Sequence, residues 1–157
     1  MPRVGTAIFR AVAVTAVQDF FEISPASNKP CRLVRLKLSQ YTDVGDAAEE
    51  ILSYSIFRIP VTATSGSGGT TPTVRATDAT GAPGCAVEVN NTTVATTSGT
   101  LEELMADAFN IREGLDLPFE PECRFQAVNA TLLVVRLNVA PTDSLTMNGT
   151  IWVEEEG

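Results

Sequence analysis

The sequence predicts an all-β protein, a single β-sandwich or jelly-roll-like domain of about 8–10 antiparallel strands with room for one short helix. Short runs rich in valine, isoleucine, threonine and phenylalanine recur along the chain, and these residues favour strands. Clusters of glycine, proline, asparagine and aspartate interrupt the runs about every dozen residues, which is typical of sandwiches and barrels. The 157 residues are 44% hydrophobic, so residues 1–157 suffice for one domain with its own core.

The first three strands follow from alternation near the N-terminus. Residues 9–15 and 19–23 form two short runs, and residues 24–30 form a loop because they contain two prolines. A third strand is expected at residues 31–39. In the first run, alternation places Phe9, Ala11 and Ala13 on one face and Arg10, Val12 and Val14 on the other.

The middle of the chain combines an apolar strand with a glycine-rich loop. Residues 51–61 form a strand with apolar side chains on both faces, which predicts burial between two layers or against a partner. Residues 62–73 are rich in threonine, serine and glycine and are expected to form an exposed, mobile loop. Thr70 follows the last glycine where a phosphate-binding loop has lysine, so phosphate binding is not expected there.

Residues 100–108 fit a helix and a strand equally well. Thr100 and Glu103 form a capping box before apolar residues at helical spacing. Leu101, Met105 and Phe109 also share one face of a strand, so both alternatives stay open. Residues 46–49 match a second capping box, which allows one helical turn.

The C-terminal third contains the clearest strands. Residues 131–139 form the most apolar run and are expected to be a central strand, and residues 145–154 alternate strictly. The two ends, residues 1–4 and 154–157, are expected to be arms or rims. The core is expected to run through Val34, Leu36, Ile56, Leu133, Val135 and Ile151.

Composition and charge argue against several classes of function. The formal net charge is -8, and histidine is absent. An acidic chain with scattered arginines is not expected to bind nucleic acid. Without histidine there is no Ser–His–Asp or Cys–His pairing, so we expect no enzymatic activity and no cofactor. No signal peptide or transmembrane stretch is expected, which predicts a protein made in the cytosol with no membrane partner.

Two groups of carboxylates are candidate sites. Asp43, Asp46, Glu49 and Glu50 crowd one segment, but their spacing differs from that of a calcium-binding EF-hand loop. A solvated loop is the favoured interpretation, with a calcium or partner contact as the alternative. Glu120 and Glu122 would point the same way in an extended segment, about 7 Å apart, yet few aromatic residues accompany them for a glycosidase. We therefore predict no catalytic and no metal-binding residues.

The remaining polar motifs have ordinary structural interpretations. Cys31, Cys85 and Cys123 are widely spaced and are expected to be buried thiols without a zinc ion, because histidines cannot complete the site. Asn90, Asn129 and Asn148 begin Asn-x-Thr patterns. They are expected to be turn and strand residues because no secretory signal precedes them.

Several segments together resemble a known family. They are residues 44–50, 88–93, 109–114, 121–122 and 143–150, the last followed by a Glu-rich end. Over most of the chain, from about residue 11 to residue 154, the sequence is similar to small structural proteins of tailed bacteriophages, of the capsid-decoration or cement type. This family brings no catalytic motif.

The resemblance implies a structural role in the virion. Decoration proteins of this kind are β-rich modules, often homotrimers, that bind the major capsid protein outside the head at capsomer junctions and oppose the pressure of packaged DNA. One alternative is a tail or neck component of the phage. A second alternative is a carbohydrate-binding jelly-roll module for host adhesion, although its candidate sugar-stacking residues are only Trp152, Tyr41 and Tyr54.

Overall fold

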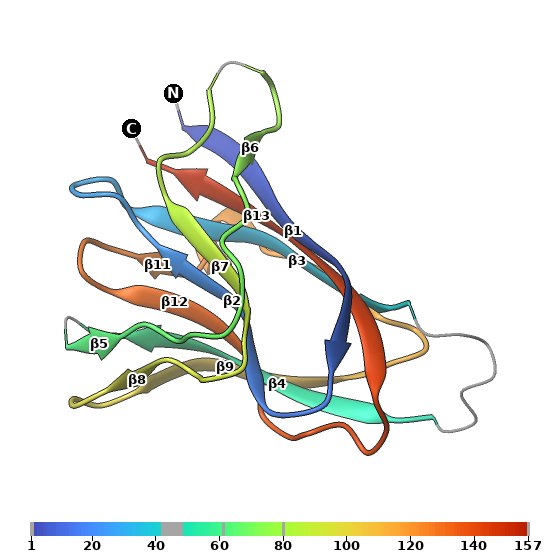
Figure 1. Cartoon of the computed structure of the whole chain (residues 1–157). Coiled ribbons are helices and arrows are strands. Elements are labelled where there is room, and N and C mark those ends of the chain that lie inside the picture. Colours follow the sequence, from blue (N-terminus) through green and yellow to red (C-terminus); the bar gives the residue numbers. More distant parts are fainter. Residues whose placement is uncertain (1, 42–48, 61, 80, 157) are drawn as a thin grey trace.

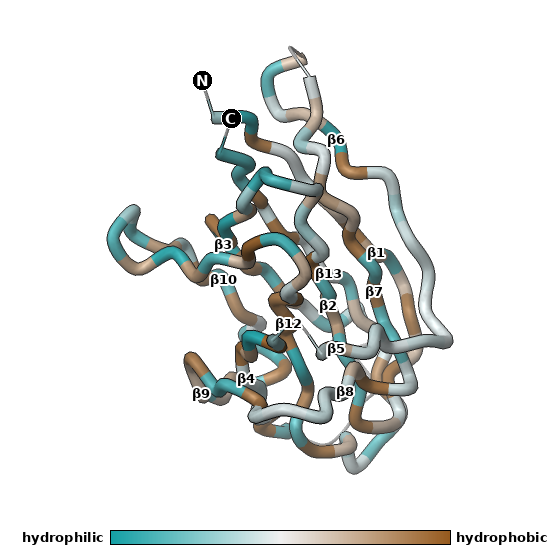
Figure 2. The backbone as a smooth tube through the Cα atoms, turned by 90° about the vertical axis from the view of Figure 1, so that its left-hand side faces the viewer, coloured by the Kyte–Doolittle hydropathy of each residue, from teal (hydrophilic) through white to brown (hydrophobic). Residues whose placement is uncertain are grey.

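The computed structural model describes residues 2–41, 49–60, 62–79 and 81–156. In these residues the chain forms thirteen strands and one short 3-10 helix, η1 (Pro121–Cys123). Two antiparallel sheets pack together as a sandwich (Figure 1), which confirms the predicted fold class. Figure 2 shows hydrophobic and hydrophilic residues alternating along strands of both sheets. The alternation lets each sheet turn an apolar face inward.

The first sheet is built around the C-terminal strand. Its order is β10-β3-β13-β1-β6, and a short strand, β11, also pairs with β3. Along β13, every second residue is buried from end to end, as the alternation predicted. The strands of this sheet are β1 (Arg3–Val14), β3 (Cys31–Gln40), β6 (Arg75–Ala76), β10 (Leu115–Pro118), β11 (Gln126–Ala127) and β13 (Leu145–Glu155).

The second sheet has the order β7-β2-β12-β4-β9. Its central strand comes from the most apolar run of the sequence, and Leu133 and Val135 of that strand are fully buried. The central-strand prediction is therefore confirmed. The strands are β2 (Gln18–Ser24), β4 (Ile51–Ile59), β7 (Ala86–Asn91), β9 (Glu102–Asn110) and β12 (Leu132–Leu137).

A small ribbon covers the outer face of the second sheet. It pairs β5 (Ala63–Thr64) with β8 (Thr96–Thr97). Under it lies a second apolar cluster of Ile59, Ala95, Leu132 and Val134. This layer explains the apolar side chains on the second face near the end of β4, because the chain itself covers that face at Phe57 and Ile59.

A β-bulge changes the expected faces of the first strand. The pairing of β1 with β13 shifts between Phe9 and Val12, and Ala11 between them has a φ of 51°. Phe9 and Val14 are therefore both buried although they differ in parity, whereas Ala11 and Ala13 are exposed. The predicted grouping of Phe9 with Ala11 and Ala13 was wrong, because an extra residue moves the side chains beyond it to the opposite face.

A second bulge corrects the predicted core. In the pairing of β13 with β3, Trp152 lies opposite Arg35 and Val153 lies opposite Leu33, so Val34 has no partner on β13. Leu33 is fully buried and Val34 is only half-buried. The other five predicted core residues are buried.

Residues 100–108 resolve as a strand. From Glu102 to Asn110 they form β9, which pairs with β4 at the edge of the second sheet. Tertiary pairing thus decides between two local patterns of equal strength. The acidic side chains of Glu102, Glu103 and Asp107 lie along this edge strand, where charge disfavours pairing with another chain.

The ends of the chain are part of the first sheet. Arg3 and Val4 of β1 pair with Glu155 and Glu154 of β13, so the start of β1 lies beside the end of β13 (Figure 1). The expectation of arms was therefore wrong for these residues. The helical turn expected at residues 46–49 lies outside the described residues, except for Glu49.

Candidate functional site

The glycine-rich segment at residues 62–73 is exposed, as predicted, but hydrogen bonds hold it to the second sheet. Glu22 on β2 accepts hydrogen bonds from the Ser65 hydroxyl and, at 3.0 Å, from the backbone amide of Gly66. Thr70 exchanges two backbone hydrogen bonds with Val89 on β7, at 2.8 and 3.0 Å. The segment is thus hydrogen-bonded to β2 and β7 as an extension of the outer layer.

A buried ion pair fixes the other half of the outer layer. Arg136 on β12 binds the carboxylate of Asp19 on β2, and its guanidinium also donates to the carbonyl of Ala95 at 2.7 Å. The backbone amide of Ala95 donates to Asp19 at 2.6 Å. These bonds hold the segment before β8 against the sheet.

Exposed apolar side chains occur at one end of the sandwich. We call Val17, Tyr41, Ile51 and Val139 the apolar end; their exposed fractions are 37%, 64%, 71% and 59%. The strand pairing brings their chain segments to the same end of the two sheets. Gln18 is paired with Leu137, the amide of Tyr41 donates to Thr146, and the amide of Asn138 donates to Ser53.

Hydrogen bonds connect the loops at this end. The carboxylate of Glu50 accepts a 2.6 Å hydrogen bond from the amide of Thr142, and the carbonyl of Glu50 accepts one from Ile111 at 3.0 Å. Asn110 donates to the carboxylate of Glu49. These bonds connect the segment before Ile51 with the end of β9 and with the loop that follows Val139.

The expectations from the sequence do not include this end. In them, Ile51 belongs to an apolar strand face, and Tyr41 is one of three candidate sugar-stacking residues. The available signal was the position of these apolar residues at or just beyond strand ends.

A shallow hollow on the outer face of the first sheet is a second candidate. It has a volume of about 310 Å³ and lies beside Trp152 on β13 and Lys37 on β3. Ser39, Asn148 and Thr150 add polar groups to its lining. An aromatic ring among polar side chains is the arrangement that sugars use.

An arginine covers one face of this aromatic ring. The guanidinium carbon of Arg35 lies 5.1 Å from the centre of the Trp152 ring. Asp116 on β10 holds Arg35 with two hydrogen bonds, of 2.7 and 2.6 Å. The bonded Arg35 lowers the pKa of Asp116 below its ordinary value. The ion pair thus holds the guanidinium over one face of the Trp152 ring.

The two carboxylate groups from the sequence are not brought together into a site. Asp43 and Asp46 lie outside the described residues, and Glu49 and Glu50 make the loop contacts given above. Glu122 lies inside η1 and Glu120 precedes it, both exposed. The expected extended arrangement of Glu120 and Glu122 was therefore wrong. Within residues 2–41, 49–60, 62–79 and 81–156, no three side chains of metal-binding type cluster.

The three cysteines are free thiols in two different environments. Cys31 and Cys85 are buried, as predicted, but Cys123 in η1 is exposed. The hydrogen bond with Cys85, burial and the nearby Glu155 carboxylate raise the pKa of the Cys31 thiol. Cys31 is therefore a protonated, unreactive core group at neutral pH.

The Asn-x-Thr asparagines are strand and turn residues, as predicted. Asn90 is in β7, Asn148 is in β13, and Asn129 is in a turn.

None of the helical residues that the structure describes forms a segment long and apolar enough to span a membrane. No family model matches the sequence, and no curated protein matches it.

Proposed function

We propose that the protein is a structural virion protein of a tailed bacteriophage, a decoration or cement protein made in the host cytoplasm. In this role it binds the major capsid protein on the outside of the head, at junctions between capsomers, and stabilises the shell against internal DNA pressure. The proposal rests on the family resemblance of the sequence and on one structural observation, the apolar end.

The apolar end supports protein binding better than the strand surface that the sequence suggested. The second face of β4 is covered by the chain's own ribbon around Ile59, so that part of the strand offers no surface to a partner, whereas Ile51 at the start of the strand is exposed. Tyr41, Ile51 and Val139 remain more than half exposed. Complete burial of one such side chain contributes roughly 1.5–3 kcal/mol, so a few of them can hold a capsid contact.

The proposed assembly is a homotrimer. Copies around a local threefold axis would each present the same end to an equivalent neighbour. Several modest contacts made by one closed trimer add up to tight binding. The net charge of -8 suits an outer surface that must not bind free nucleic acid.

A binding experiment tests the role of the apolar end. Heads assembled without this protein are mixed with the purified chain and sedimented, and the bound fraction is measured for Ile51→Glu and Val128→Glu. Val128 is the matched control because it is also an exposed apolar residue, with an exposed fraction of 45%. It precedes the start of β12, whereas the apolar end lies beyond the other end of that strand. We expect Ile51→Glu to weaken binding at least about tenfold, because a charge would be buried unpaired. Equal binding by both variants, with unchanged melting, would refute the proposed surface.

The hollow beside Trp152 supports carbohydrate binding as a second candidate function. A glycan array probed with the intact protein and with Trp152→Ala distinguishes the two candidates. Glycans that bind the intact protein but do not bind the Trp152→Ala variant would favour the adhesion module over the decoration protein. A tail or neck location is the other structural alternative, and the copy number per virion separates it from the head.

A further inference from the structure

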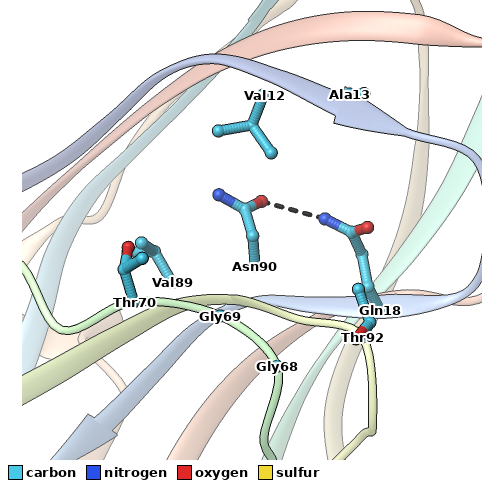
Figure 3. Close-up of a pocket in the computed structure, with 9 residues that line it drawn as sticks. All are labelled: Val12, Ala13, Gln18, Gly68, Gly69, Thr70, Val89, Asn90 and Thr92. Carbon is cyan, nitrogen blue, oxygen red and sulfur yellow. Dashed lines mark hydrogen bonds between the residues drawn. The ribbon is translucent and has the colours of Figure 1, made fainter.

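A small cavity opens where the edges of the two sheets meet. β1 of the first sheet lies beside β7 of the second sheet there, and the bulge at Ala11 displaces β1 locally. The cavity has a volume of about 170 Å³ and is lined by residues from β1, β7, the start of β2 and the glycine-rich segment (Figure 3). This volume is comparable to the roughly 150 Å³ engineered cavity that admits benzene in another protein.

The side-chain amide nitrogen of Asn90, which lines the cavity, has no hydrogen-bond partner. Asn90 is only 7% exposed, and its Oδ1 atom accepts a 2.9 Å hydrogen bond from Nε2 of Gln18. Its Nδ2 atom is buried without a hydrogen-bond partner. Figure 3 shows this nitrogen pointing away from Gln18, toward the space between Val12 and Thr70. A buried donor without a partner is costly, so an acceptor in the cavity would be stabilised.

The backbone holds this amide in place. Asn90 has a φ of 57°, a left-handed conformation that asparagine tolerates better than most residues. Its side chain is also fixed by Gln18, which is 2% exposed. The donor is therefore preorganised, which lowers the cost of binding a partner.

The other walls determine what fits. Val12 and Val89 supply apolar surface, and Gly68, Gly69 and Thr70 are exposed residues that form the opening. Only glycine fits at position 69, because the Cβ of any other residue would lie 2.0 Å from the carbonyl oxygen of Val89. No basic side chain is among the nine residues that line the cavity. A carboxylate or phosphate would therefore lose hydration without gaining a counter-charge.

We propose that this cavity is a binding site for a small uncharged molecule that carries one carbonyl oxygen on a short branched aliphatic body. The carbonyl accepts the hydrogen bond from Nδ2 of Asn90, and the aliphatic body packs between Val12 and Val89. The site adjoins the apolar end, since Gln18 directly follows Val17, but its lining contains none of the four residues of that end.

The test uses 3-methylbutan-2-one as the probe and nuclear magnetic resonance of the 15N-labelled full chain. We expect saturable shifts of the Asn90 side-chain amide and of the Gly69 and Thr70 backbone amides. The matched control is 2-methylpropanoate, which has a similar branched body but a negative charge and is expected to leave these signals unchanged. Shifts that increase linearly without saturation, or equal binding of the carboxylate, would overturn the proposal.

Two variants separate the donor from the cavity. Asn90→Gly keeps the left-handed backbone and removes the donor, and it is expected to weaken binding about tenfold. Val12→Phe fills the space from the half-buried wall and is expected to abolish saturable binding while Asn90 is retained. Thermal melting shows that each variant is folded. Unchanged binding in the folded Val12→Phe variant alone is sufficient to overturn the proposal, even if Asn90→Gly does not fold.

Discussion

Arg136 on β12 donates two hydrogen bonds to the carboxylate of Asp19 on β2, with Nε 2.5 Å from Oδ1 and Nη2 3.1 Å from Oδ2. The Asp19 side chain is completely buried and that of Arg136 is 12% exposed. The guanidinium also lies over the ring of Phe57, at 5.2 Å. One ion pair thus joins two neighbouring strands and the covering segment at Ala95.

The first prediction concerns this buried pair. Asp19→Asn leaves the Arg136 charge without its counter-ion, and we expect a loss of about 3–5 kcal/mol in unfolding free energy. The matched control is Glu102→Gln, which breaks the exposed pair with Arg58 and is expected to cost less than about 1 kcal/mol. Urea unfolding measures both values. A cost for Asp19→Asn no larger than that of the control would contradict the role given to the pair.

The second prediction uses the bulge in β3. Leu33→Ala removes a fully buried side chain and is expected to cost about 2–5 kcal/mol. Val34→Ala, one residue away, changes a half-buried side chain and is expected to cost about 1 kcal/mol or less. A larger loss of unfolding free energy for Val34→Ala than for Leu33→Ala in chemical denaturation would contradict the position of the bulge.

The third prediction concerns the glycine-rich segment. Gly69→Ala would place its Cβ 2.0 Å from the carbonyl oxygen of Val89, so the segment must move away from β7. We expect a melting temperature several degrees lower. Gly99→Ala is the control, since its nearest contact is the Thr62 hydroxyl at 3.3 Å, and it is expected to leave melting nearly unchanged. Identical melting of the two variants would show that the segment is not fixed to the sheet.

The fourth prediction is a pH dependence at Asp116. The hydrogen-bonded Arg35 holds the pKa of Asp116 below its ordinary value of 3.8, and Lys37 acts in the same direction. Because the folded-state pKa is depressed, the stabilisation is present above the ordinary pKa and is lost as pH falls through the folded value.

A titration followed by carboxyl-carbon resonances tests this prediction. Arg35→Gln is expected to raise the Asp116 midpoint, and Lys37→Gln is expected to raise it less. A midpoint that is the same in Arg35→Gln and in the unmodified protein would contradict the assigned ion pair.

Local pattern predicted the fold class and most core strands. Strict alternation over residues 145–154 and the apolar run at residues 131–139 correspond to β13 and β12, the central strands of the two sheets. These patterns are reliable because a buried strand must satisfy them along its whole length.

The errors arose where one residue changes the register. Neither the bulge at Ala11 nor the one at Val34 has a local sequence signal, since each depends on the neighbouring strand β13. The hydrogen bonds that hold residues 62–73 were also invisible, because Glu22 is more than forty residues away. The two candidate sites could not be predicted for the same reason. Ile51 and Asn90 belong to a site only through neighbouring segments that are distant in the sequence.

The proposed role in the virion is tested most directly by a reconstruction of purified phage particles with copy counting. We expect many copies of this two-sheet sandwich on the outer surface of the head, in groups of three at capsomer junctions, with Tyr41 and Ile51 facing the shell. Copies confined to the tail or to a single vertex would contradict it, as would the absence of the protein from the particle.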